Sequence, residues 1–162
     1  MKIGIIMGSA SDKELVSSAT KTLDALGADY EVTIASAHRT PKDVEEYSCS
    51  ARSRGLVCII AVAGLSAALP GVVAAHTDLP VIGLPVGCGP LKGQDALYAM
   101  AMMPPGVPVA TVGIDSVANA ALFAARILAT HDPKIAQALA NKKEADAQKV
   151  RASREDLPWP KP

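Results

Sequence analysis

The segment Leu56-Val57-Cys58-Ile59-Ile60-Ala61-Val62 is a continuous apolar run of strand length, and it decides the fold class of this chain. It is far too short to span a membrane, which takes about 20 apolar residues in a helix. A strand that is apolar at every position is typical of a parallel sheet with both faces covered by helices. The run therefore predicts an α/β protein in which this strand is buried on both faces.

On both sides of this run, short apolar segments alternate with longer segments of helical pattern. The expected strands are Ile3–Met7, Tyr30–Ala35, Leu56–Val62, Val81–Pro85 and Val107–Val112. The expected helices are Asp12–Leu26, Pro41–Arg54, Leu69–His76, Asp95–Met103, Ala118–His131 and Pro133–Ala152. This alternation predicts a doubly wound sheet in a three-layer α/β/α sandwich. We expect one domain over residues 1–152 and a proline-rich tail over residues 153–162, in which Leu157–Pro162 is extended or disordered.

Composition narrows the functional class. The 162 residues suffice for one well-buried core, and 16 basic residues balance 16 acidic ones. Because no basic run or aromatic interleaving is present, we expect no nucleic-acid partner. No segment has the length of a signal-peptide core or a membrane helix, so we expect a cytoplasmic protein without a membrane partner. Abundant alanine and only 3% aromatic residues suit closely packed helices and favour a homo-oligomer.

The cysteines and histidines do not follow a metal-binding pattern. Cys49, Cys58 and Cys88 are odd in number, widely spaced and set among apolar residues, which predicts buried free thiols. His76 and His131 lie near the ends of expected helices, where a structural role is the simpler interpretation. We therefore expect no metal ion.

A histidine and an arginine are adjacent in Ser36-Ala37-His38-Arg39-Thr40-Pro41, between the second expected strand and the second expected helix. Histidine titrates near neutral pH, and arginine is a permanent cation suited to phosphate. Pro41 fits the first turn of the following helix, so the pair lies at the carboxyl end of a strand, where open α/β sheets bind ligands. A lone histidine is more often structural, but this position favours a functional role for Ser36, His38 and Arg39.

The segment Gly8-Ser9-Ala10-Ser11-Asp12 follows the first expected strand. It offers two hydroxyl groups and the amino end of a helix to an anion such as a phosphate monoester. A structural interpretation is equally open, because Ser11 to Glu14 match a capping box. The glycine spacing is that of neither a dinucleotide-binding loop nor a Walker loop, so neither NAD nor ATP is expected as a cofactor.

The turns after the third and fourth expected strands are rich in small residues. In Ala63–Gly71, glycines let the backbone approach a ligand and its N–H groups can hold a carboxylate, but a tight turn into a packed helix explains the composition equally well. We interpret Gly87–Asp95 as a mobile covering loop. Right-handed crossovers place these turns on one edge of the sheet, together with the two turns described above. The chain has no Gly-x-Ser-x-Gly elbow, so a serine hydrolase is not expected.

Several of these segments, taken in chain order over residues 3–130, resemble the N5-carboxyaminoimidazole ribonucleotide mutase family of de novo purine synthesis, which includes the catalytic subunit of phosphoribosylaminoimidazole carboxylase. The segments that carry the resemblance are Met7–Asp12, Ser36–Pro41, Leu69–Gly71, Leu79–Val86, Gly93–Leu97, Met103–Thr111 and Asn119–Ala121. The first two together are highly specific for this family, and the proline–glycine borders of the later strands support it.

The resemblance implies a flavodoxin-like fold and a homo-octamer with active sites between subunits. It also implies a cofactor-free transfer of a carboxyl group from the exocyclic nitrogen of an aminoimidazole ribonucleotide to ring carbon C4, by decarboxylation and recarboxylation. Ser11 and Arg39 would bind the 5′-phosphate, Asp12 the ribose hydroxyls, and Ser9 with the third-turn backbone the carboxylate or CO2. The implied set is His38 as the proton carrier, with Ser9, Ser11, Asp12, Ser36, Arg39, Gly64, Ser66 and Ala67 for substrate binding.

The third turn departs from the family pattern. Bacterial mutases usually read Gly-Gly-Ala-Ala-His-Leu-Pro-Gly there, whereas this chain has Ala68 at the position of the histidine. The related class that carboxylates aminoimidazole ribonucleotide with free CO2 or bicarbonate usually reads Gly-Arg-Ser-Asn; Ser66 resembles that class, but Leu65 and Ala67 do not. Three functions therefore stay open: the mutase, the direct carboxylase, and a phosphate-binding scaffold without catalysis.

Overall fold

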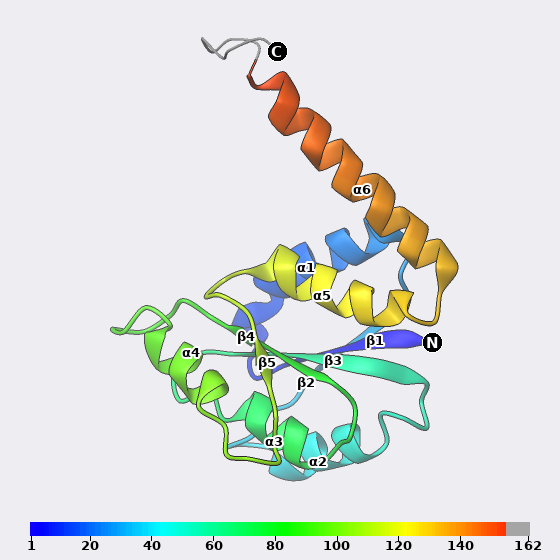
Figure 1. Cartoon of the computed structure of the whole chain (residues 1–162). Helices are drawn as coiled ribbons and strands as arrows, with labels where there is room; N and C mark the ends of the chain where they lie inside the picture. The colour runs from blue at the N-terminus through cyan, green and yellow to red at the C-terminus, as the bar shows by residue number, and fades with distance from the viewer. Residues whose placement is uncertain (155–162) are drawn as a thin grey trace.

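The fold is built on one parallel sheet of five strands in the order β2-β1-β3-β4-β5. The structure, a computed structural model, describes residues 1–154 of the chain (Figure 1). The strands are β1 (Lys2–Met7), β2 (Tyr30–Ile34), β3 (Leu56–Ala63), β4 (Val81–Pro85) and β5 (Ala110–Thr111). The helices are the short η1 (Ala10–Asp12), α1 (Lys13–Leu26), α2 (Pro41–Cys49), α3 (Leu69–Ala75), α4 (Gln94–Ala101), α5 (Val117–Ala129) and α6 (Pro133–Ala152). This strand order is the flavodoxin-like one, so the predicted parallel α/β fold is confirmed.

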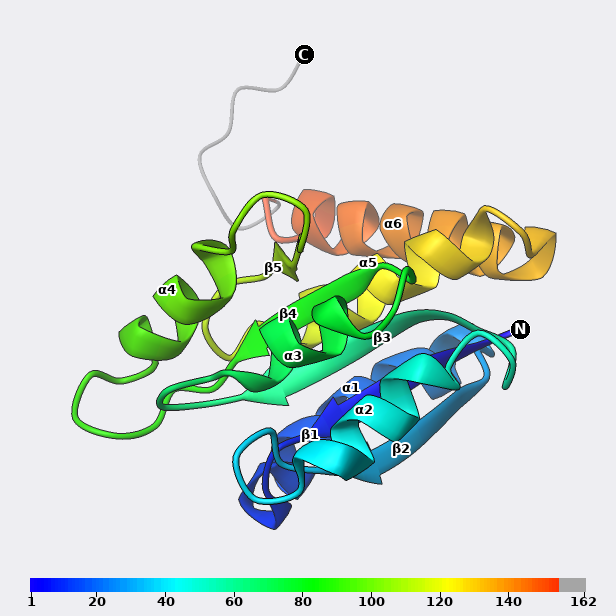
Figure 2. The ribbon, with the colours of Figure 1, turned by 90° about the horizontal axis from the view of Figure 1, so that it is seen from below.

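Helices cover both faces of the sheet, which gives the molecule three layers (Figures 1 and 2). Helices α1 and α5 pack on one face, and α2, α3 and α4 lie on the other. In β3, Cys58, Ile60 and Val62 join the core under α1 and α5. Their neighbours Ile59 and Ala61 join the core on the opposite face. The two-residue period of a strand explains this division, and the run at residues 56–62 is buried on both faces as predicted.

The second helix is shorter than expected, because α2 ends at Cys49 rather than at Arg54. The hydroxyl of Ser50 donates a hydrogen bond to the Glu46 carbonyl at 2.6 Å. Side-chain bonds of this kind compete with the regular helical pattern. The chain then continues in turns up to Gly55, whose φ of +81° ends any helical path.

Strand β5 is also shorter than expected, with Ala110–Thr111 in place of Val107–Val112. It lies at the edge of the sheet and pairs with β4, Ala110 standing opposite Ile82. Pro108 has no N–H group to donate to the ladder, which explains why pairing begins after it.

The sheet has a switch point between β1 and β3. After β1 the chain crosses to β2 through α1 on one face, whereas after β3 it crosses to β4 through α3 on the other face. The loops that follow these two neighbouring strands therefore diverge and leave a crevice at the carboxyl edge of the sheet. Open α/β sheets bind their ligands at such a point.

Helix α6 extends away from the rest of the molecule (Figure 1). Its bounds, Pro133–Ala152, agree with the sequence prediction, and Ile135 near its start is buried. The predicted extended segment Leu157–Pro162 lies outside the described residues. Over residues 1–154, no helix has the length and apolar character needed to cross a membrane.

Candidate active site

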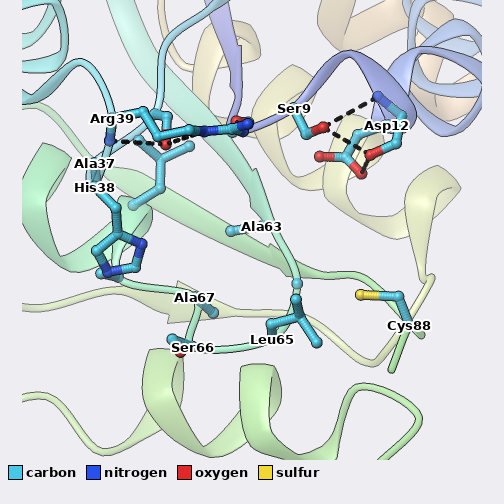
Figure 3. A pocket seen from close by; sticks show the side chains of 16 residues that line it. Ser9, Asp12, Ala37, His38, Arg39, Ala63, Leu65, Ser66, Ala67 and Cys88 are labelled. Atoms are coloured by element: carbon cyan, nitrogen blue, oxygen red, sulfur yellow. Dashed lines mark hydrogen bonds between the residues drawn. The ribbon is translucent and has the colours of Figure 1, made fainter. Parts of the chain in front are cut away.

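The loops at the carboxyl ends of β1, β2, β3 and β4 surround a cavity of about 480 Å³ (Figure 3). A cavity of this size suits a small-molecule ligand. It coincides with the switch point of the sheet. All the residues that the sequence suggested for the site line it: Ser9, Ser11, Asp12, Ser36, His38, Arg39, Gly64, Ser66 and Ala67.

The loop after β1 contributes two linked hydroxyl groups. Ser9 caps η1 by accepting a hydrogen bond from the Ser11 amide at 3.3 Å, and it accepts a second bond from the Ser11 hydroxyl at 2.8 Å. The residue that caps α1 is Asp12, and its side chain makes no capping bond. The interpretation of Ser11 as the start of a capping box is therefore wrong. Its hydroxyl is not used to start the helix and lines the cavity instead.

The Asp12 carboxyl at the end of this loop lies 3.2 Å from the Ser11 hydroxyl. Partial burial raises its pKa above the ordinary value of 3.8, and hydrogen bonds from the Ser11 side chain and the Ser9 backbone offset only part of that rise. The same partial burial strengthens any hydrogen bond that the carboxylate accepts from a ligand hydroxyl.

The loop after β2 is held by bonds within itself and by one long side chain. The Ser36 amide donates to the Thr40 hydroxyl at 2.9 Å, and the Thr40 amide donates to the Ser36 carbonyl at 2.8 Å. Arg39 reaches across the cavity edge, where its Nη2 donates to the Gly8 carbonyl at 3.0 Å (Figure 3). The Ser36 hydroxyl accepts from Arg39 Nε at 3.4 Å. The guanidinium is thus tied to the first loop at Gly8, the residue before Ser9.

The His38 imidazole comes from the same loop and lies at the edge of the cavity (Figure 3). Within residues 1–154, no side chain or backbone group is hydrogen-bonded to its ring nitrogens. Both nitrogens therefore remain open to a ligand. An imidazole in this situation can donate a proton to a bound molecule and accept one from it.

The loop after β3 has an unusual backbone. Leu65 has φ +53° and Ala67 has φ +39°, in the left-handed region that residues with a side chain rarely adopt. The Ala67 amide donates to the Gly64 carbonyl at 3.1 Å and closes the turn. Left-handed residues within a turn are components of backbone concavities that bind anions, so this loop can hold a carboxylate.

The sequence of the chain matches a known protein family. The family model described as AIR carboxylase matches residues 2–149, a range that includes all four loops of the cavity. The chain belongs to the AIR carboxylase family. The suggested family resemblance is therefore confirmed.

Members of the AIR carboxylase family with two different names resemble this chain. The N5-carboxyaminoimidazole ribonucleotide mutase of Pyrococcus abyssi is 50% identical over 143 residues, which cover 88% of this chain and 82% of that protein. The phosphoribosylaminoimidazole carboxylase of Saccharomyces cerevisiae is 53% identical over 130 residues, which cover 80% of this chain and 23% of that longer protein. Among solved structures, Treponema denticola PurE superposes with a TM-score of 0.86 at 31% identity, over 97% of this chain and 98% of that one.

This member of the AIR carboxylase family also brings residues to the cavity that are not in the implied set of site residues, among them Leu65, Ala68 and Cys88. The expectation of buried thiols is correct for Cys58, where burial raises the pKa to about 12. It is wrong for Cys49, which is exposed, and for Cys88, which is half-buried at the cavity. The signal for Cys88 was its place directly after the fourth strand, in the loop that was expected to cover the site.

Proposed function

We propose that this protein converts N5-carboxyaminoimidazole ribonucleotide into 4-carboxy-5-aminoimidazole ribonucleotide, a step of de novo purine synthesis. Membership of the AIR carboxylase family and the name of the Pyrococcus abyssi relative support this activity. The observation that carries the proposal is the gathering of His38, Arg39 and the serines of the first loop around one cavity. These are the groups that a proton transfer on a phosphorylated ligand requires.

The nucleotide is held by the first two loops. Ser11 and Arg39 bind the 5′-phosphate, since a fixed guanidinium and a neighbouring hydroxyl suit a phosphate dianion. Ser36 positions Arg39 through its hydroxyl. Asp12 accepts hydrogen bonds from the ribose hydroxyls. Ser9 binds the migrating carboxylate in this scheme, together with the backbone of the third loop.

His38 carries the proton through the reaction. The N-carboxylate is a carbamate, and when its nitrogen takes a proton from His38 the C–N bond breaks and CO2 is released. Carbon C4 of the resulting aminoimidazole is nucleophilic and attacks CO2. The adduct then returns its C4 proton to His38 and regains aromaticity. One imidazole that can donate a proton and accept one performs both transfers.

The third loop holds CO2 near C4. The Gly64–Ala67 backbone and Ser66 contact the carboxylate or the CO2 derived from it, and Ala67 is buried at the base of the loop. Holding the two reactants together in one cavity raises their effective concentration far above that of dilute dissolved CO2. No metal or organic cofactor takes part in this scheme.

Direct carboxylation of aminoimidazole ribonucleotide with CO2 is a second candidate function. The 53% identity with the Saccharomyces cerevisiae carboxylase favours it, and so does Ser66, which resembles the third turn of the direct carboxylases. Ala68 leaves the third loop without the histidine of the bacterial mutases and is the reason to keep a candidate without catalysis. A scaffold that binds phosphate without catalysis is the third candidate.

One assay separates the three. Formation of the C4-carboxylated product is followed from each substrate separately while bicarbonate is varied. Product from the N-carboxylated substrate, independent of bicarbonate, identifies the mutase. Product only from aminoimidazole ribonucleotide with rising bicarbonate identifies the carboxylase, and no product from either identifies the scaffold.

Replacement of His38 tests the proton carrier. We expect His38→Asn to lower kcat by about 100-fold or more, because general acid–base catalysis contributes about that much. The Kd for the nucleotide product, measured by calorimetry, stays within a few-fold of wild type, since the ring makes none of the proposed phosphate contacts. A variant that turns over normally would remove His38 from the mechanism.

We further propose that the protein assembles as a homo-octamer and acts in the cytoplasm. Large exposed apolar side chains support an assembly: Val32, Ile34, Leu91, Tyr98 and Met102. Three free thiols suit a reducing compartment.

A further inference from the structure

The loop after β3 and the loop after β4 interlock beside the cavity. Cys88 Sγ lies against Gly64, at the place where a Cβ atom on that glycine would stand. In the opposite direction, the Leu65 side chain lies against Gly89, where an added Cβ would be 2.5 Å from Leu65 Cδ2. Each loop thus supplies one side chain and one glycine that makes room for the side chain of the other.

Both side chains also line the cavity, and Figure 3 shows them toward the side away from His38. Leu65 keeps a large apolar side chain although its backbone is left-handed and the residue is 51% exposed. Strained backbone persists where the surroundings hold it in place. The contact with Gly89 is one such restraint, and it gives the exposed leucine a position at the junction of the two loops.

The loop after β4 is anchored at its base. The Val86 amide donates to the Ala63 carbonyl at 3.0 Å, which carries the pairing of β3 and β4 up to the cavity. The Gly87 amide donates to Asp115 Oδ1 at 2.8 Å. Cys88 follows directly and therefore reaches Gly64 from a fixed point.

We propose that Leu65 and Cys88 form a seal between these loops that retains CO2 during turnover. The proposal rests on the mutase function. In that reaction the C–N bond of the carbamate breaks as the nitrogen takes a proton from His38, and the same CO2 then forms a bond to C4 as the C4 proton returns. CO2 that escapes in between becomes bicarbonate in solution and leaves free aminoimidazole ribonucleotide. The Leu65–Cys88 seal thus determines whether the carboxyl group of the product comes from the substrate or from the solvent.

The test supplies unlabelled N-carboxylated substrate in the presence of 13C-bicarbonate. Mass spectrometry gives the labelled fraction of the product, and free aminoimidazole ribonucleotide is measured in parallel after subtraction of the enzyme-free rate. We expect a low labelled fraction in wild type. In Leu65→Ala we expect it to rise about tenfold, with release of free aminoimidazole ribonucleotide, since a shortened side chain lets a trapped reactant leave.

Two further pairs of variants separate the seal from general damage. Cys88→Ala removes the atom beside Gly64 and raises the labelled fraction, whereas Cys88→Ser keeps an atom there and restores most of the retention. Gly89→Ala forces the two loops apart at Leu65. Its matched control is Gly55→Ala, which has a similar positive φ of +81° but no atom within 4 Å of the added Cβ.

The outcomes distinguish the seal from the function on which it rests. Wild-type protein that forms no product from the N-carboxylated substrate contradicts the proposed function. Wild-type turnover with a labelled fraction that neither Leu65→Ala nor Gly89→Ala changes overturns the seal alone. A high labelled fraction already in wild type also overturns it.

Discussion

Asp12 combines two opposing effects in one side chain. Hydrogen bonds from the Ser11 hydroxyl and the Ser9 backbone stabilise its carboxylate, yet partial burial prevails and its pKa is raised. A binding site often accepts such a cost, because a group that is partly stripped of water interacts more strongly with its ligand. We expect this cost to appear in the free energy of unfolding of the protein without ligand.

The raised pKa of Asp12 predicts a pH effect of defined sign. From the ordinary value of 3.8 up to the raised pKa, the folded protein binds more protons at this site than the unfolded chain. The free energy of unfolding of wild type, relative to Asp12→Asn, therefore falls as the pH rises through that range. Urea unfolding at a series of pH values measures it, and a difference that stays constant with pH contradicts the raised pKa.

At the scale of the elements, the amino ends of the strands, opposite the cavity, hold ion pairs that stabilise the fold. Glu31 at the start of β2 pairs with Lys2 of β1 at 2.6 Å and with Arg54 at 3.0 Å. Burial alone would raise its pKa, but hydrogen bonds from Lys2 and Arg54 prevail and hold the pKa below the ordinary 4.5. These pairs join the amino ends of two strands to the segment that follows α2.

We expect Glu31→Gln to lower the free energy of unfolding at neutral pH by about 1 kcal/mol, the scale of partly exposed ion pairs. A lowered pKa of Glu31 stabilises the folded protein at pH values above the ordinary pKa of 4.5. This contribution is lost as the pH falls through the pKa of the folded state. The two proteins therefore converge in acid. Turnover of the variant should equal that of wild type, because the site lies at the other edge; a loss of activity would contradict this separation.

Sequence reasoning succeeded where a property is local to one segment. The apolar run of β3 and the amphipathic pattern of α6 were correctly bounded within a residue, because each is a pattern contained in one segment. Turns at the ends of consecutive parallel strands must share an edge, so the gathering of His38 and Arg39 with Ser9 around one cavity also followed from the order of the elements.

The errors concern features that no periodic pattern along the sequence shows. The early end of α2 depends on side-chain bonds to its own carbonyls, and the short β5 on its edge position. The place of Cys88 against Gly64, and that of Leu65 against Gly89, depends on how two loops meet. No periodicity or motif encodes such a meeting, so the contacts that these residues make could be recognised only in three dimensions.

At the scale of the whole molecule, the exposed apolar side chains are the feature that the fold of one chain leaves unexplained. Tyr98 on α4 and Met102 directly after α4 are 63% and 80% exposed, and Val32 and Ile34 are exposed on the edge strand β2. Exposed apolar groups gathered on particular elements mark interaction surfaces. They fit the proposed assembly of identical subunits.

Light scattering after size exclusion tests the assembly. We expect a mass near eight times the 16.7 kDa of one chain. Met102→Glu is expected to shift the mass toward smaller species, because a charge in an apolar interface is strongly unfavourable. Lys42→Glu, at an exposed polar position on α2, serves as the control. A monomeric wild type, or an assembly that Met102→Glu leaves intact, would contradict the part assigned to this surface.

The left-handed backbone of Leu65 has a consequence for how the protein evolves. Glycine is the residue that adopts this conformation without steric cost, so selection for heat resistance alone favours its appearance at position 65. Selection in cells that grow in air, where dissolved CO2 is scarce, favours a bulky apolar side chain there. A library at this codon, divided between a heat challenge and growth without added purines, is expected to yield glycine from the first and leucine or methionine from the second. An enzyme that retains the CO2 released from its substrate can therefore be less stable than the same fold with glycine at position 65.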